Sequence, residues 1–259
     1  MMPKPIFISF ANQPQLAENL AENFLALVQE KLQNQESIHI SLTGGTMGSA
    51  ILEYAKRRPE ISSVDWSRVH FWWSDERFVP SGDADRNEQQ AKDALLASLD
   101  IPAKNLHVMG SSDKFENAED AAADYLEELR KFAAPEADYP LFDLSLLGMG
   151  PDGHIASLFP HRNEILNQSD VTLAIHNSPK PPPHRITLTR PVLCGSQQIW
   201  FMVSGEDKHE ALSRALSAAS LEDEELNERV LSETPAAGAR GTVTTKFFTD
   251  DAARGDLSL

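Results

Sequence analysis

The sequence predicts an α/β fold in which helices cover both faces of a mostly parallel, doubly wound sheet. Short runs of β-branched and aromatic residues alternate with amphipathic segments along almost the whole chain, and this alternation is typical of parallel sheets. The chain has 259 residues, which is enough to bury a large core without disulfides. It contains no internal repeat and no long linker, so we expect a single α/β domain over residues 1–259.

The N-terminal half begins with a strand over 5–10, the run PIFISF. A helix over 15–33 follows, because its leucines recur every three or four residues and so share one face. The run SIHISL predicts a strand over 37–42, and the apolar spacing of TMGSAILEYAKR predicts a helix over 46–57. By the same criteria this half continues as strand 68–73, helix 87–99, strand 105–109 and helix 118–132.

The C-terminal half contains more strands. FDLSLLGMG, over 142–150, is an apolar run that predicts a buried strand. Short runs with β-branched residues then predict strands over 171–176 and 184–189, and QIWFMVSG predicts another over 198–205. An amphipathic helix over 207–219 and a last strand over 242–248 complete the expected order.

Composition limits the kinds of partner and the location. The 39 acidic and 23 basic residues give a formal charge of −16, whereas nucleic acids and anionic membranes require a cationic surface. No apolar run approaches the roughly 20 residues that a membrane-spanning helix needs. Cys194 is the only cysteine and no signal peptide precedes the first strand. We therefore expect a cytoplasmic protein that binds neither nucleic acid nor membrane.

The loops after the strands are the first places to look for a site, because doubly wound sheets bind ligands beyond the carboxyl ends of their strands. Gly44, Gly45 and Thr46 follow the strand that ends at Leu42. Glycines permit close approach of the backbone, and free N–H groups at a helix start attract an anion such as phosphate. The alternative is a simple turn in which Thr46 is the helix N-cap.

A second loop candidate is the segment Asp75, Glu76, Arg77, which follows an aromatic strand. A guanidinium group stays charged at any working pH and can orient a carboxylate or stabilise an oxyanion. A surface salt bridge is the alternative interpretation.

The third candidate is the stretch LLGMGPDGHIASLFP, which contains His154. Its glycines match the G-x-G-x-x-G pattern of dinucleotide sites, but Pro160 would cut the following helix short and the acid expected about twenty residues further on is missing. We interpret the glycines as a tight loop that presents His154, with Asp152 two residues before it. Histidine is suited to accept and return a proton near neutral pH, although a lone histidine can also be structural.

Basic residues form the fourth candidate in this acidic chain. Lys180, Arg185 and Lys208 lie in the segments SPKPPPHRITLT and VSGEDKHEAL and could clamp a phosphate from the side opposite the glycine loop, or each could be a solvated surface charge. The eight histidines show no metal-ligand spacing and there is no C-x-x-C pair, so no metal site is expected.

Taken together and in this order, SLTGGTMGSAIL, SDERFVP, FDLSLLGMGPDGHIASLFP, SPKPPPHRITLT and VSGEDKHEAL closely resemble the 6-phosphogluconolactonase family, from about residue 35 to about residue 215. The resemblance implies a three-layer α/β fold shared with glucosamine-6-phosphate deaminases and ribose-5-phosphate isomerases. It implies hydrolysis of 6-phosphogluconolactone to 6-phosphogluconate, a step of the oxidative pentose phosphate pathway, with a small sugar-phosphate lactone as the binding partner and no required cofactor. The oligomeric state stays open, and a monomer is compatible with the sequence.

The resemblance also implies residue roles. His154 and Arg77 match catalytic positions, and the phosphate-binding positions fall on Gly44, Gly45, Thr46, Arg185 and Lys208, with Lys180 in the same motif. Lactone hydrolysis requires a base for water, a cation for the oxyanion and an acid for the leaving oxygen. We expect His154 to serve as base and then acid, Arg77 to stabilise the oxyanion, and Asp75 or Asp152 to orient these groups.

Three alternatives remain. Amino-sugar phosphate deaminases and isomerases carry Asp-Glu-Tyr in place of Asp-Glu-Arg, and an acid where this chain has Phe159. A non-catalytic sugar-phosphate-binding module and a dehydrogenase are the other two. The chain departs from the family at Asp85, Arg86 and Asn87, which leaves the start of the following helix open, and no residue after 230 is assigned to the site.

Overall fold

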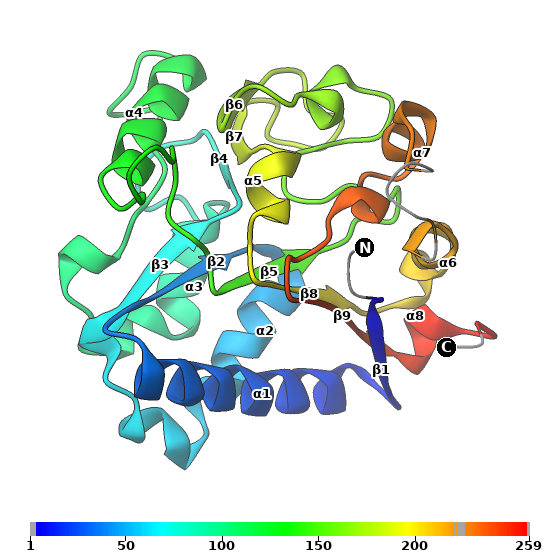
Figure 1. Ribbon diagram of the computed structural model, residues 1–259, viewed down its shortest axis with the longest axis horizontal. Coiled ribbons are helices and arrows are strands. Elements are labelled where there is room, and N and C mark those ends of the chain that lie inside the picture. The colour runs from blue at the N-terminus through cyan, green and yellow to red at the C-terminus, as the bar shows by residue number, and fades with distance from the viewer. Residues whose placement is uncertain (1–3, 220, 222–225, 258–259) are drawn as a thin grey trace.

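The computed structural model describes residues 4–219, 221 and 226–257, so residues 1–3 and 258–259 of the expected domain lie outside the described part. Its centre is a six-stranded sheet in the order β1-β9-β8-β5-β2-β3 (Figure 1). Every pairing in this sheet is parallel, which confirms the predicted fold class. The strands are β1 (Ile6–Phe10), β2 (Ile38–Leu42), β3 (Val69–Trp73), β5 (Leu144–Gly148), β8 (Gln198–Val203) and β9 (Thr244–Asp250).

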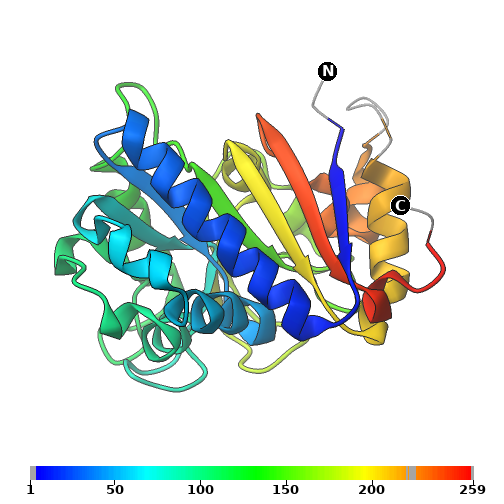
Figure 2. The same ribbon diagram turned by 90° about the horizontal axis from the view of Figure 1, so that it is seen from below.

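Helices cover both faces of this sheet, because side chains alternate between two apolar layers along each strand. Ile40 and Trp73 belong to the layer beneath one group of helices: α1 (Gln13–Asn34), α2 (Gly45–Lys56) and α3 (Asn87–Ala94). Trp72 and Phe201 belong to the layer beneath the other group: α4 (Ala118–Arg130), α5 (Arg190–Cys194), α6 (His209–Ala219), α7 (Glu228–Glu233) and α8 (Asp251–Arg254). Figure 2 shows α1 lying across its face of the sheet. The expected three-layer arrangement is confirmed.

A second, antiparallel sheet of three strands was not predicted. Its order is β4-β7-β6, with β4 (Asp75–Arg77), β6 (Thr172–Ile175) and β7 (Arg185–Leu188). The expected strands over 171–176 and 184–189 therefore exist but lie outside the parallel sheet, and β4 is too short to show a periodic pattern. The register places Arg77 opposite Arg185, so this small sheet brings two predicted site residues together.

Two other expectations were wrong in detail. The segment 105–109 is not a strand: it begins in the 3-10 turn that ends at Asn105 and makes one isolated bridge, between Phe71 and Leu106. At its end the Arg86 guanidinium donates to the carbonyl of Met109 at 2.6 Å. The helix expected over 87–99 ends at Ala94 and is followed by a 3-10 turn. The 3-10 turns are η1 (Pro59–Ser63), η2 (Trp66–Arg68), η3 (Leu96–Ser98), η4 (Ala103–Asn105), η5 (Asn163–Leu166), η6 (Glu206–Lys208) and η8 (Pro235–Gly238).

None of the helices in the described part of the chain combines the length and apolar character that crossing a bilayer requires.

Candidate active site

A cavity of about 580 Å³ opens beyond the carboxyl ends of β2, β5 and β8. This is where a doubly wound sheet is expected to bind its ligand. Of the ten predicted site residues all except Asp152 line it: Gly44, Gly45, Thr46, Asp75, Arg77, His154, Lys180, Arg185 and Lys208. Five segments that are distant in the sequence therefore meet at one place.

The loop after β5 presents His154 to this cavity. The Gly150 N–H donates to the His154 carbonyl at 3.0 Å and the Gly153 N–H to the Gly150 carbonyl at 2.9 Å, while Gly153 has a φ of +92° that side chains rarely adopt. A Cβ on Gly150 would lie 2.0 Å from His154 Nδ1, so the ring rests directly on the glycine backbone. The helix that a dinucleotide motif needs does not follow; the chain makes a bridge between Ile155 and Leu158 instead.

Asp152 lies behind His154 and contacts its ring. His154 Nδ1 is 2.6 Å from Asp152 Oδ1. Although burial raises the pKa of Asp152, the hydrogen bond from His154 and the positive charges of His154 and Lys180 outweigh burial and hold that pKa well below its usual range. An ionised carboxylate can only accept, so Nδ1 carries the proton of this bond, and in the neutral ring Nε2 then keeps a lone pair. This is the tautomer that a general base requires.

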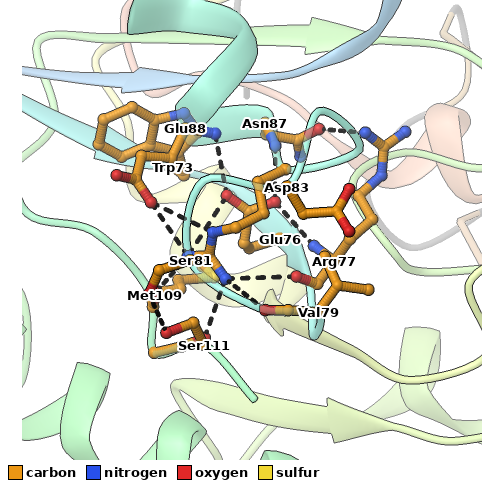
Figure 3. A network of polar contacts seen from close by, with 12 residues as sticks. Trp73, Glu76, Arg77, Val79, Ser81, Asp83, Asn87, Glu88, Met109 and Ser111 are labelled. Atoms are coloured by element: carbon orange, nitrogen blue, oxygen red, sulfur yellow. Dashed lines mark hydrogen bonds and ion pairs between the residues drawn. The ribbon is translucent and has the colours of Figure 1, made fainter. Parts of the chain in front are cut away.

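Arg77 is held by neutral oxygens. Its Nη1 donates to the side-chain oxygen of Asn87 and to the Asp85 carbonyl, both at 2.7 Å, and its Nε is buried with no partner among the described residues. The Asn87 amide donates in turn to the Asp75 carbonyl at 2.7 Å, and Figure 3 shows Asn87 directed at Arg77. The sequence identified Asn87 only as a departure from the family, yet it is the first residue of α3 and lines the cavity.

Asp75 is paired with Arg185 rather than with the histidine. Its side chain accepts from Ser157 Oγ at 2.7 Å and lies 3.9 Å from Arg185 Nη1. Burial lowers the pKa of Arg185, and the carboxylate of Asp75 opposes that change. Of the two acids expected to orient the catalytic groups, Asp152 contacts His154, whereas Asp75 contacts Asn87, Ser157 and Arg185.

Arg185 also holds the proline-rich loop. It donates to the carbonyl of Pro181 at 2.8 Å and to that of Lys180 at 3.2 Å. The loop places Lys180 Nζ 3.7 Å from Asp152 Oδ1. Burial lowers the pKa of Lys180, Asp152 raises it, and the nearby Lys208 and Arg185 charges lower it further. Two lysines and an arginine therefore share one end of the cavity.

The glycine loop forms the opposite wall. Helix α2 begins at Gly45, its N-cap is Gly44, and no side chain caps it, so the alternative of Thr46 as N-cap is wrong. The Gly45 N–H donates to Gln90 Oε1 at 3.0 Å. The uncapped first turn presents N–H groups and the positive end of the helix dipole, a suitable environment for an anion.

Lys208 lies in η6, directly after β8, and Asp207 Oδ2 accepts from its Nζ at 2.6 Å. Within the described part of the chain, no group of three or more His, Cys, Asp or Glu residues has an arrangement that could hold a metal ion. The cavity is lined by cations, by the start of α2, by His154 with Asp152 behind it, and by the acids Asp75 and Asp207. The cations suit an anionic substrate, and the histidine–carboxylate pair suits proton transfer.

Comparison with known proteins adds to this geometry. Residues 11–246 match the family model described as glucosamine-6-phosphate isomerases/6-phosphogluconolactonase. A 6-phosphogluconolactonase from Streptomyces coelicolor is 38% identical, with 99% of this chain and 96% of that protein aligned. The 6-phosphogluconolactonase from Mycobacterium tuberculosis is 44% identical, with 82% and 81% aligned. The crystal structure of the Thermotoga maritima 6-phosphogluconolactonase has a TM-score of 0.80 at 26% identity and covers 95% of this chain and 100% of that one.

Proposed function

The chain belongs to the glucosamine-6-phosphate isomerase/6-phosphogluconolactonase family, and from that premise we propose that it hydrolyses 6-phospho-D-glucono-1,5-lactone to 6-phospho-D-gluconate. The observation that carries this proposal is the 2.6 Å contact between His154 and Asp152, in a cavity that also contains Arg77 and a helix N-terminus. The reaction would be the second step of the oxidative pentose phosphate pathway, and we place it in the cytoplasm.

The proposed mechanism uses His154 twice. A water molecule attacks the lactone carbonyl carbon while Nε2 of His154 takes one of its protons. The carbonyl oxygen becomes an oxyanion, which the guanidinium group of Arg77, a residue that lines the cavity, stabilises in this scheme. The bond between this carbon and the ring oxygen then breaks, and the imidazolium returns the proton to that oxygen. One water is added, and the product is a carboxylic acid with a free hydroxyl.

The remaining cavity groups bind the phosphate in this scheme. Lys208, Arg185 and Lys180 supply positive charge. Gly44, Gly45 and Thr46 form the start of α2; the Gly45 N–H already donates to Gln90, so the phosphate would meet the positive end of the helix dipole there. Binding energy from a phosphate remote from the ester positions the reacting carbonyl. Lys180 is also close enough to Asp152 to help orient the catalytic pair.

The alternatives are less well supported. The acid that deaminases carry is replaced by Phe159, which is buried against the His154 ring with a centroid distance of 4.6 Å. An apolar ring at this place cannot shuttle protons between carbons. A dehydrogenase is disfavoured by the missing helix after the glycine pattern, and a mere binding module has no need of the His154–Asp152 pair.

The test generates the lactone in situ with glucose-6-phosphate dehydrogenase and follows acid release above the spontaneous rate. The wild-type protein should exceed that rate, and His154→Ala should lose most of the excess while still binding 6-phosphogluconate in calorimetry. Wild-type release at the spontaneous rate would refute the lactonase proposal. Near-normal turnover by His154→Ala would refute the assignment of His154.

A further inference from the structure

Glu76 lies between two predicted site residues but does not line the cavity. Its side chain is 1% exposed. Oε1 accepts from the backbone N–H of Arg77 at 2.8 Å and of Asn87 at 2.7 Å, and Oε2 accepts from that of Glu88 at 2.9 Å (Figure 3). The carboxylate therefore occupies the N-terminal end of α3, where the first N–H groups of a helix lack intrahelical partners.

Arg86 supports this carboxylate from the other side. Its guanidinium, also 1% exposed, lies 3.8 Å from Glu76 Oε2 and 3.2 Å from Glu88 Oε2. Burial is the dominant influence and raises the pKa of Glu76 to about 7, even though Arg86 and the three N–H groups act to lower this pKa. Since all three N–H groups must donate to this side chain, the geometry is that of the ionised form.

The first turn of α3 contacts both Arg77 and the glycine loop, which line the cavity. Asn87 accepts from Arg77 Nη1 at 2.7 Å. The same side-chain oxygen lies so close to Gly44 that a Cβ there would be 1.7 Å from Asn87 Oδ1. One turn later, Gln90 accepts from the Gly45 N–H at 3.0 Å. A displacement of this turn would move the oxyanion-binding arginine and the glycine loop together.

We propose that Glu76 is a positioning residue: its buried carboxylate holds the first turn of α3, and that turn places Arg77 through Asn87 and the glycine loop through Asn87 and Gln90. The inference rests on the proposed lactonase function, because it concerns the same reaction. It gives the middle acid of the Asp-Glu-Arg segment a role at a distance from the substrate.

The first test is Glu76→Gln. An amide nitrogen cannot accept from an N–H, so at least one of the three backbone donors loses its partner while the side chain keeps its shape. Because small misplacements of catalytic groups are costly, we expect kcat to fall about 10- to 100-fold and KM to rise. Glu88→Gln is the matched control: it removes a charge that lies even closer to Arg86, at 3.2 Å against 3.8 Å for Glu76, but that accepts from none of these three backbone N–H groups. Its kcat should stay within about twofold of wild type.

A double-mutant cycle separates positioning from general destabilisation. In an Arg77→Ala background, Glu76→Gln should have little further effect on kcat, whereas its effect on KM through the glycine loop should persist. An equal fall in kcat in both backgrounds would overturn the proposal, as would a Glu76→Gln enzyme that behaves like Glu88→Gln. If instead the wild type shows no lactonase activity, the proposed function fails first, so the two failures are distinguishable.

A second variant decides the matter if Glu76→Gln does not fold. Asn87→Ala leaves the capping carboxylate in place and removes the amide that links α3 to Arg77. We expect its kcat to fall by a factor similar to that of Glu76→Gln. An unchanged kcat would overturn the inference, because Asn87 is the side chain through which the first turn of α3 holds the Arg77 guanidinium.

Discussion

Replacing Asp152 by Asn tests how much its charge contributes to catalysis while keeping its shape. Asp152 Oδ1 accepts from both the ring and the backbone N–H of His154, at 2.6 and 3.3 Å, and an Asn oxygen can keep both bonds. What is lost is the attraction between a carboxylate and the imidazolium that forms in the proposed transition state. Opposite charges about 4 Å apart attract by about 4 kcal/mol at an effective dielectric constant of about 20.

Solvent reduces this figure, because the Asp152 side chain is 36% exposed. Taking half of the attraction as the lower bound, the loss is about 2 to 4 kcal/mol, which corresponds to a fall in kcat of about 30- to 1000-fold. The acid-release assay measures this fall in kcat. The control is Asp138→Asn, because Asp138 is an exposed carboxylate remote from the cavity. A kcat for Asp152→Asn within about threefold of wild type would refute the assigned role of this carboxylate.

Two further predictions concern binding and stability. Lys208→Ala should raise KM by about tenfold or more with a smaller change in kcat, since a phosphate contact remote from the ester acts mainly on binding; a change confined to kcat would contradict this. Burial and the neighbouring charges of His70 and His107 lower the pKa of His39 from 6.5 to about 3, so below about pH 6.5 the unfolded chain binds a proton that the folded chain excludes. Stability is therefore lost as the pH falls, by about 2 kcal/mol at about pH 5 from this residue. Denaturant unfolding at about pH 7.5 and 5 should show a smaller loss in His39→Asn than in wild type, and parallel losses would exclude the effect.

Several candidate site residues could be predicted from the sequence because they follow strands of the parallel sheet. Once β2, β5 and β8 are recognised as parallel neighbours, their carboxyl ends must lie along one edge, and Gly44, His154 and Lys208 come together for that reason. The apolar periodicity that predicted these strands is a local property of the chain. The prediction that their carboxyl ends share one edge of the sheet therefore did not depend on knowing which side chains are in contact.

The pairing of β4 and the contributions of α3 could not be predicted in this way. Strand β4 is three residues long, and its partner β7 lies more than a hundred residues further along the chain. No local sequence pattern therefore predicts this pairing. Asn87, Gln90 and Glu76 act through hydrogen bonds to backbone groups that only the folded chain brings near. An uncharged Asn at a helix start reads as an ordinary cap, and its contact with Arg77 has no signature in the sequence.

The way the cavity cations are held explains how an acidic protein can bind an anion. With a net charge of −16, the field of the whole chain repels a phosphate, so attraction must be generated locally. Arg77 donates to an amide and a carbonyl, and Arg185 donates to loop carbonyls while its nearest carboxylate, Asp75, is 3.9 Å away. Neutral acceptors satisfy a guanidinium without cancelling its charge, so Arg77 keeps its positive potential in the cavity, whereas Asp75 offsets part of that of Arg185. Lys208 differs, because Asp207 lies 2.6 Å from its ammonium group, and a bound phosphate has to compete with that acid. The arginines therefore attract the phosphate without giving up a carboxylate partner to it, whereas Lys208 must exchange Asp207 for the phosphate.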